Sequence, residues 1–400
     1  MRCVVLSVLL WMGTFSPTLA ASQRSTPPHT DTVATASATS SVLSDPFVRR
    51  SGKKGLDLLY NMQFQEARAR FDSIDARYPN HPVGPFLKGL NVWWRILLNL
   101  TDTSHDEAFL DAMNETIARC DNLLDEDPDH FDATFFKGAA LGFRGRLRSN
   151  RGKWFKAALD GKRAIGYVRE IGEQAPENDD YVFGKGMYDY YAAIIPEEYP
   201  VSKALMWMMP DGDKERGLRL LQRAATEGWY IQTEAVYFLA QIHYLYENDF
   251  HTAREYITWL RETHPKNAYF HAFEGRLYAR WGYWGHAEEV FDAILERCAN
   301  DAPGYTVHTE EMAHYYLARR YLYTDAYDTA LRHLARLETL TSHTPDDPRY
   351  RVMGYLYQGM VYDAMGHRDM ARGRYHRVLK MEDVWGAHDE AERYLESPYE

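Results

Sequence analysis

Along most of the chain, large apolar residues recur at helical spacing, with none of the alternation typical of strands. In five places the pattern repeats around an alanine: Ala67, Ala253, Ala287, Ala330 and Ala371. Four residues after these anchors stand Phe71, Ile257, Phe291, Leu334 and Tyr375, and seven residues after them stand Ile74, Leu260, Ile294, Leu337 and Val378. These spacings put the residues on one face of an α-helix. The pattern predicts five amphipathic helices.

A second series lies twelve residues before the anchors and consists mostly of small residues: Gly55, Gln241, Gly275, Ala318 and Gly359. Three residues further on, the side chains are large: Leu58, Tyr244, Tyr278, Tyr321 and Tyr362. A small residue lets two helices approach closely, and a bulky neighbour fills the remaining gap. Each unit is therefore predicted to be a pair of antiparallel helices.

These units resemble the tetratricopeptide repeat (TPR) family. The best example contains Gly275, Tyr278, Gly282, Trp284, Ala287 and Phe291 in register, and Ala253 and Ala287 are separated by 34 residues. The resemblance covers 48–81 and 234–384. It implies a superhelix in which the first helix of each unit lies on the inner face.

The middle of the chain, 82–232, is more irregular but still predicts helical pairs. The helices are expected over 86–100 and 107–124, over 131–148 and 154–171, and over 181–195 and 214–227. The fold class is therefore all-α, a superhelical solenoid of about eight antiparallel helix pairs. One TPR-like domain spans 47–400, and a polar helix over 387–395 caps it.

The N-terminus is typical of an exported protein. Residues 1–20 are predicted to be a signal peptide, with Arg2 before an apolar run and small residues at 18–20 for cleavage. An uncleaved anchor is the alternative. Residues 21–46, rich in Ser, Thr, Ala and Pro, predict a flexible linker. No later run is long enough to span a membrane, and we expect location in a bacterial periplasm or envelope.

Composition narrows the function. The net charge is −11, which argues against nucleic-acid binding. The sequence holds no His-Glu-x-x-His pair, no phosphate-binding glycine loop and no Gly-x-Ser-x-Gly elbow. We therefore expect no enzymatic activity, no cofactor and no metal. After cleavage Cys120 and Cys298 remain, and both are expected to be buried, unpaired thiols.

The TPR resemblance places aromatic and apolar residues, with three arginines between them, on the inner face. These partner-binding candidates are Phe135, Phe143, Phe238, Tyr246, Arg276, Arg280, Tyr315, Arg319, Tyr323 and Leu356. An aromatic groove with guanidinium groups suits an extended peptide that carries carboxylates. The alternative is that these rings pack against neighbouring helices as core.

A basic run lies within this acidic chain. Between 137 and 163 there are nine Lys and Arg residues against one acid, Asp160, and the anion-patch candidates are Arg144, Arg146, Arg148, Arg151 and Lys153. Such a patch could hold an anionic head group. The alternative is a solvated helical face whose Arg and Lys stems cover apolar surface.

The segment 183–213 combines glycines, prolines and a Met/Trp cluster. It could form an adaptable binding ledge or fold into the core. Its order of Gly-x-Gly, apolar helix, proline and Gly-Asp-Lys-Glu-x-Gly also resembles the Iml2-like TPR family, which implies no enzymatic activity. The first hypothesis is a non-enzymatic exported scaffold that binds a protein or peptide on its concave face. The alternative is a carrier of a lipid or small anionic ligand that uses 183–213 and 137–163. Such a carrier could also contact a membrane surface peripherally.

Overall fold

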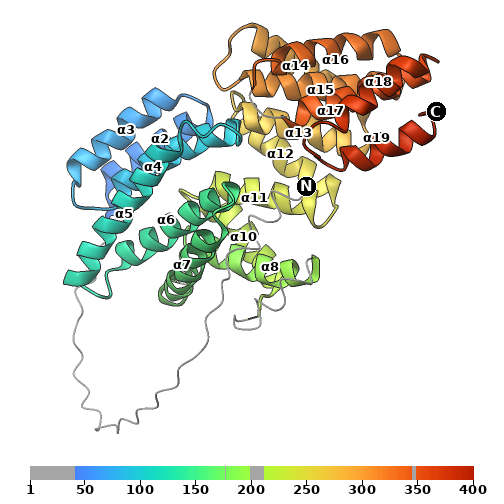
Figure 1. The fold of residues 1–400 in the computed structure, drawn as a ribbon. Coiled ribbons are helices and arrows are strands. Elements are labelled where there is room, and N and C mark those ends of the chain that lie inside the picture. Colours follow the sequence, from blue (N-terminus) through green and yellow to red (C-terminus); the bar gives the residue numbers. More distant parts are fainter. Residues whose placement is uncertain (1–40, 176, 199–210, 345–347) are drawn as a thin grey trace, which may run out of the picture.

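The structure is a computed structural model that describes residues 41–175, 177–198, 211–344 and 348–400. In these ranges it contains seventeen α-helices and one short 3-10 helix, η1 (Val42–Ser44), and no strand (Figure 1). The all-α prediction is confirmed. The predicted signal peptide at 1–20, most of the predicted linker and residues 199–210 lie outside the described residues.

Sixteen of the helices form pairs joined by short connections, except that the fourth pair flanks 199–210. The pairs are α2 (Pro46–Tyr60) with α3 (Phe64–Arg77), α4 (Val83–Leu98) with α5 (Asp106–Glu126), α6 (Phe131–Asn150) with α7 (Trp154–Gln174), α8 (Val182–Glu198) with α10 (Lys214–Glu227), α11 (Gln232–Leu245) with α12 (Phe250–Thr263), α13 (Ala268–Trp281) with α14 (Trp284–Ala299), α15 (Val307–Leu322) with α16 (Tyr327–Thr341), and α17 (Arg349–Ala364) with α18 (Arg368–Val378). The last helix, α19 (Ala387–Glu396), packs on α17 and α18. The described residues thus contain the eight pairs and the capping helix that the sequence predicts.

Contacts within a pair explain the repeat. A β-carbon added at Gly275 of α13 would lie 2.7 Å from the Phe291 ring of α14, and one at Gly359 of α17 would overlap Tyr375 of α18. Both rings are fully buried. The small residue and the ring sixteen positions later therefore form one contact, because each ring occupies the space that the missing side chain leaves.

The first helices of the pairs lie on the inner side of the curve. Consecutive first helices contact each other: α2 with α4, α4 with α6, α13 with α15, and α15 with α17. Consecutive second helices do not form comparable contacts in the described chain. Helices that approach their equivalents this closely are on the side of smaller radius, in agreement with the TPR resemblance. That this side forms an open concave face for a partner stays a prediction.

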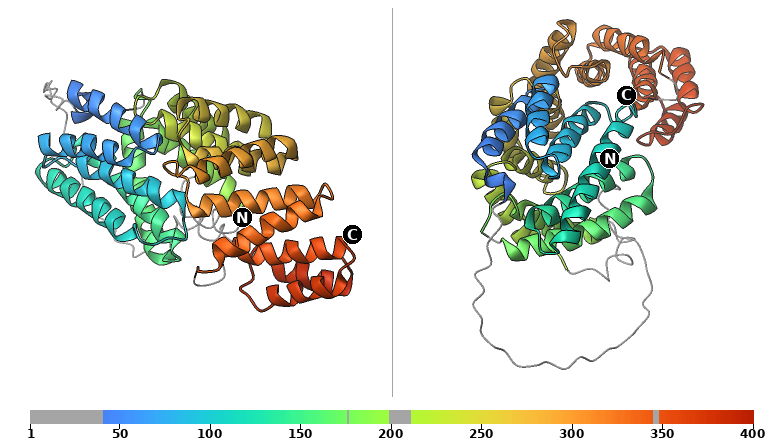
Figure 2. Two further views of the ribbon diagram at one scale, coloured as in Figure 1. Left: turned by 90° about the horizontal axis from the view of Figure 1, so that it is seen from above. Right: turned by 90° about the vertical axis from the view of Figure 1, so that its left-hand side faces the viewer.

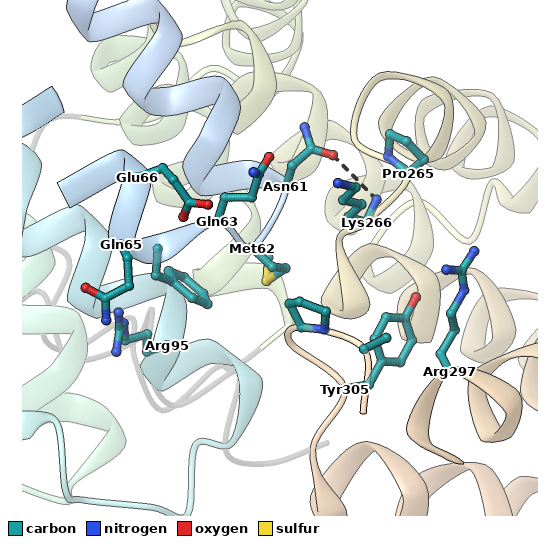
Figure 3. Close-up of a pocket in the computed structure, with 13 residues that line it drawn as sticks. Asn61, Met62, Gln63, Gln65, Glu66, Arg95, Pro265, Lys266, Arg297 and Tyr305 are labelled. Atoms are coloured by element: carbon teal, nitrogen blue, oxygen red, sulfur yellow. Dashed lines mark hydrogen bonds between the residues drawn. The ribbon is translucent and has the colours of Figure 1, made fainter. Parts of the chain in front are cut away.

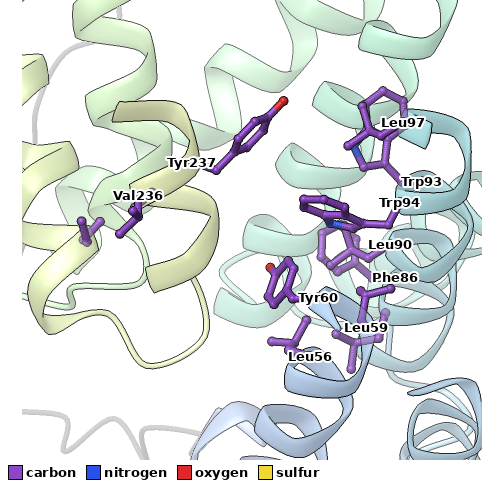
Figure 4. Packing of buried hydrophobic residues seen from close by; sticks show 14 of the residues in the cluster. Leu56, Leu59, Tyr60, Phe86, Leu90, Trp93, Trp94, Leu97, Val236 and Tyr237 are labelled. Carbon is purple, nitrogen blue, oxygen red and sulfur yellow. The ribbon is translucent and has the colours of Figure 1, made fainter. Parts of the chain in front are cut away.

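The superhelix closes on itself after its first turn. Trp94 of α4 and Tyr60 of α2 both donate hydrogen bonds to Glu234 of α11, at 3.1 and 3.2 Å. Asn267, at the start of α13, donates to the carbonyl oxygen of Tyr60 at 2.8 Å. Figure 4 shows Tyr60, Trp94 and Tyr237 converging from α2, α4 and α11. Two views in Figure 2 show the blue N-terminal helices beside the yellow ones, while the C-terminal pairs extend away.

Residues 41–46 correct one expectation. They were included in the predicted flexible linker, but they pack on the first turn. The backbone N–H of Val42 donates to Asp132 at 2.8 Å, and the Tyr230 hydroxyl donates to the carbonyl of Leu43 at 2.8 Å. Asp45 then caps the N-terminus of α2. The folded part begins before Phe47 because this segment covers the edge of the closed turn.

In the described ranges Cys120 and Cys298 are free thiols, as predicted. Cys120 is fully buried, and burial raises its pKa to about 12. Cys298 is only half-buried, so the expectation of full burial is wrong for this residue, because α14 ends next to it.

The closure predicts a dependence of stability on pH through His264. Its Nδ1 accepts from the Asn61 amide at 3.3 Å, so its Nε2–H donates to Thr233 at 3.0 Å. Burial, with a smaller contribution from Lys53, lowers the pKa of His264 to about 4. The unfolded chain binds this proton near pH 6.5. Between these values the unfolded state carries more protons, so stability falls as the pH falls, by about 2 kcal/mol from pH 7 to pH 5 for this residue alone.

We expect His264→Gln to reduce the difference between the free energies of unfolding at pH 7 and pH 5 by that amount in urea titrations. The matched control is His251→Gln, since the side chain of His251 is 65% exposed. Equal pH dependence in the two variants would contradict the assignment.

Candidate functional site

The inner face of the first turn surrounds a cavity of about 370 Å³. Side chains from the first helices α2, α4, α6, α8 and α11 and from the second helix α7 line it, and most of them are apolar or aromatic. Among its polar groups are Arg146 and Glu234. Closure creates this space, because the contact of α2 and α4 with α11 completes the ring of helices around it.

Arg146 projects from the cavity-facing side of α6. Phe135, Ala139, Phe143 and Arg146 follow one another at spacings of three and four, so they share a helix face, and all four line the cavity. The guanidinium carbon of Arg146 lies 4.9 Å from the ring centre of Trp93 and 5.4 Å from that of Phe238. It forms no hydrogen bond or ion pair with any described residue.

Glu234 is the buried carboxylate of the cavity. It is 6% exposed, and its Oε1 accepts from Tyr60 and Trp94. Burial raises the pKa of Glu234, although these hydrogen bonds and the charge of Arg146 oppose the change. Arg146 lies beyond ion-pair distance from it, so Glu234 chiefly joins the two ends of the turn.

A second cluster of arginines lies on α13 and α15. The guanidinium of Arg276 lies over Tyr269 and Phe273, and that of Arg280 lies 4.8 Å from the Tyr244 ring centre. Arg319 is surrounded by five rings at 5.4 to 5.9 Å: Trp284, Tyr315, Tyr316, Tyr323 and Tyr357. We call Arg276, Arg280 and Arg319 the inner arginines.

The inner arginines lack acidic partners. In the described chain none of them forms an ion pair. Arg276 and Arg280 donate to the Ala272 carbonyl and the Asn248 side chain. The Nε of Arg319 is buried without a hydrogen-bond partner among the described residues. All three side chains are partly exposed.

The predicted partner-binding residues therefore divide between two surfaces. Phe135, Phe143, Phe238 and Tyr246 line the cavity, whereas the inner arginines and Tyr323, which is 45% exposed, belong to the second half of the superhelix. Tyr315 and Leu356, only 4% and 2% exposed, are core residues, so placing them on an open face is wrong. Both belong to the buried apolar cluster of the C-terminal pairs, as the alternative interpretation expects. A role in partner binding for the others stays a prediction.

The predicted anion patch is largely neutralised within the protein. Arg144 donates to both oxygens of Asp160, at 3.0 and 2.7 Å, and Arg148 donates to the same carboxylate at 2.5 Å. Arg151 is paired with Asp106 at 2.6 Å. Lys153 is exposed before α7. A shared anion site of all five candidates is therefore wrong, and Arg146 alone faces the cavity.

A further pocket of about 510 Å³ lies at the seam between the N-terminal pair and α13–α15. Sequence patterns gave no signal for it, because turns far apart in the chain form it. Figure 3 shows Arg95 on one side, and Lys266, Tyr305 and Arg297 on the other. The backbone N–H of Lys266 donates to the side chain of Asn61 at 3.4 Å across the seam.

The described part of segment 183–213 contributes to the cavity. Phe183, Met187, Tyr191 and Ile195 of α8 line it, and Tyr191 and Ile195 also belong to the buried core, as the alternative interpretation expects. The Met/Trp cluster lies outside the described residues. In the ranges that the structure describes, no three His, Cys, Asp or Glu side chains are placed to hold a metal ion. No described helix has the length and apolarity to cross a membrane.

Comparisons with known proteins yield structural neighbours only. No family model matches the chain, and no curated protein matches it. The C-terminal part of a TPR repeat-containing protein from Cytophaga hutchinsonii is 15% identical, with 76% of this chain and 98% of that chain covered and a TM-score of 0.37. Human IFIT1, solved as a dimer with PPP-AAAA, is 14% identical, with 80% and 69% covered and a TM-score of 0.41. The P58(IPK) TPR domain is 13% identical, with 87% and 98% covered and a TM-score of 0.25.

The chain is TPR-like. This statement rests on its helix pairs and on the contact between small residues and rings. At such low identities and TM-scores the structural neighbours carry no functional argument. The resemblance to Iml2-like proteins and the export of the chain stay predictions.

The neutralised basic run gives a test of stability. Asp160 is 1% exposed and holds two arginines, so Asp160→Asn should leave them without their counter-charge and lower the free energy of unfolding by about 3 kcal/mol. Asp121→Asn is the matched control, because its pair with Lys137 is half exposed and should contribute less than about 1 kcal/mol. Urea titrations measure both. Equal losses in the free energy of unfolding would contradict the expectation that the buried carboxylate contributes more than the exposed one.

Proposed function

We propose that this TPR-like protein is a non-enzymatic scaffold that binds an acidic segment of a protein or peptide partner along α13 and α15. The observation that carries the proposal is the row of inner arginines without acidic partners. The chain has 57 acidic residues against 46 Lys and Arg, yet within the described ranges no carboxylate forms an ion pair with these three. Guanidinium groups bind carboxylates through paired hydrogen bonds, which makes an acidic segment the matching occupant.

The aromatic setting strengthens this interpretation. Rings beside each guanidinium restrict its motion and exclude part of the surrounding water, so less ordering is needed when a carboxylate arrives. Tyr323 adds an exposed ring beside Arg319. Buried arginines flanked by aromatic side chains are also the residue types that dominate binding energy at interfaces.

We also propose that the scaffold acts outside the cytoplasm, in a bacterial periplasm or envelope. The apolar run at 4–11 and the small residues at 18–20 support this proposal. Cell fractionation followed by N-terminal sequencing should recover a mature chain that begins at Ala21. A full-length chain in the envelope would instead indicate an uncleaved anchor.

The binding proposal predicts the effect of removing two inner arginines. The probe is a set of labelled twelve-residue peptides rich in Glu, each paired with a version in which Gln replaces Glu. The wild type should bind acidic members at least tenfold more tightly than their Gln versions, a difference of about 1.4 kcal/mol. Arg276→Met with Arg319→Met should abolish this preference in fluorescence anisotropy titrations.

The matched control is Arg254→Met on α12. Arg254 is also half-buried and also lies over a ring, that of Trp281 at 5.7 Å, but it belongs to a second helix. It should leave the peptide preference unchanged. If the wild type shows no preference for acidic peptides, or if the double variant keeps it, the proposal fails.

A further inference from the structure

We propose that the cavity of the first turn binds a single-chain amphiphile with a carboxylate head, and that Arg146 binds this head while the apolar walls hold the chain. The site is separate from the inner arginines, and its ligand class differs from the acidic peptide proposed for them. It makes specific the carrier hypothesis that stands as the alternative to the scaffold.

The walls set the chemistry of the chain. The walls of the cavity are mostly apolar. Examples from α4, α6 and α8 are Phe86, Leu90, Phe143, Phe183 and Ile195. A volume of about 370 Å³ falls in the range of small-molecule sites, which combine apolar walls with a few placed polar groups. A peptide would bring amide groups that this lining leaves without hydrogen-bond partners, which is unfavourable. An alkyl chain brings none.

Arg146 sets the chemistry of the head. Its guanidinium is fixed between the rings of Trp93 and Phe238 and has no hydrogen bond or ion pair in the described structure. By contrast, its neighbours Arg144 and Arg148 share Asp160. A permanent charge in apolar surroundings without a counter-charge is unfavourable. A ligand carboxylate supplies the counter-charge and accepts two hydrogen bonds.

The other acidic groups of the lining do not take this role. Glu234 accepts from Tyr60 and Trp94 and lies beyond ion-pair distance from Arg146. Asp180 accepts from the backbone N–H groups of Tyr230 and Ile231 at 2.7 and 3.0 Å, and burial raises its pKa. Both acids are thus held at the closure of the turn by other donors, and neither forms an ion pair with Arg146.

The experiment uses the mature chain and a fluorescent probe, 11-(dansylamino)undecanoic acid. Hexadecanoate and 1-hexadecanol, which share the chain and differ in the head, compete for the probe. Hexadecanoate should displace the probe from the wild type at a concentration at least tenfold lower than 1-hexadecanol requires. Arg146→Met should remove this preference and keep hexadecanol binding, and Arg146→Lys should retain part of the preference. Ala139→Phe, which fills the cavity, should weaken both competitors while urea titration confirms that the variant is folded.

The outcomes separate the two proposals. Arg276→Met with Arg319→Met should lose acidic peptides and keep hexadecanoate, and Arg146→Met should do the reverse. Failure of both competitors to displace the probe, or equal displacement by both from the wild type, overturns the carboxylate assignment. If Arg146→Met still prefers hexadecanoate to 1-hexadecanol, the carboxylate assignment is overturned as well. The proposal for the inner arginines is unaffected by that result.

Discussion

The closure of the first superhelical turn is the constraint on which the rest of the structure depends. Glu234 accepts hydrogen bonds from Tyr60 of α2 and Trp94 of α4, which precede it by more than 130 residues. The Asn267 amide donates to the carbonyl oxygen of Tyr60 at the end of α2. A buried carboxylate is costly unless such donors reach it, so the position of α11 is fixed with respect to α2 and α4. This contact turns an open concave face into a cavity, and it leaves only the later pairs with an exposed inner surface.

The helix pairs could be predicted because their determinants are local. Gly275 and Phe291, or Gly359 and Tyr375, lie sixteen residues apart, and the fit between them repeats along the chain. The closure could not be predicted in this way. It depends on small rotations between pairs that add up over a whole turn, and no short-range pattern records their sum. For the same reason, residues 41–46 resemble a linker in composition, although their backbone forms hydrogen bonds with the side chains of Asp132 and Tyr230.

The candidate site shows a similar division. Residue type and spacing identified which arginines share a region, but only the fold decides which carboxylates they meet. Asp160 is the single acid in its stretch of sequence, and it neutralises Arg144 and Arg148 together because α6 and α7 pack closely. Arg146 lies on the adjacent face of the same helix and is directed to the cavity. Two residues along a helix are thus enough to separate a structural arginine from a candidate ligand-binding one.

Tyr269 joins the two surfaces physically. It belongs to the lining of the cavity, its hydroxyl is hydrogen-bonded to that of Tyr237 at 2.9 Å, and its ring lies 5.7 Å from the guanidinium of Arg276. An occupant of the cavity would therefore contact a side chain that supports the first of the inner arginines. The cavity and the inner arginines therefore share the Tyr269 side chain as a common wall. Packed interiors respond to added volume by shifting neighbouring side chains. The two candidate surfaces are consecutive parts of one inner face, divided by the point at which the superhelix closes.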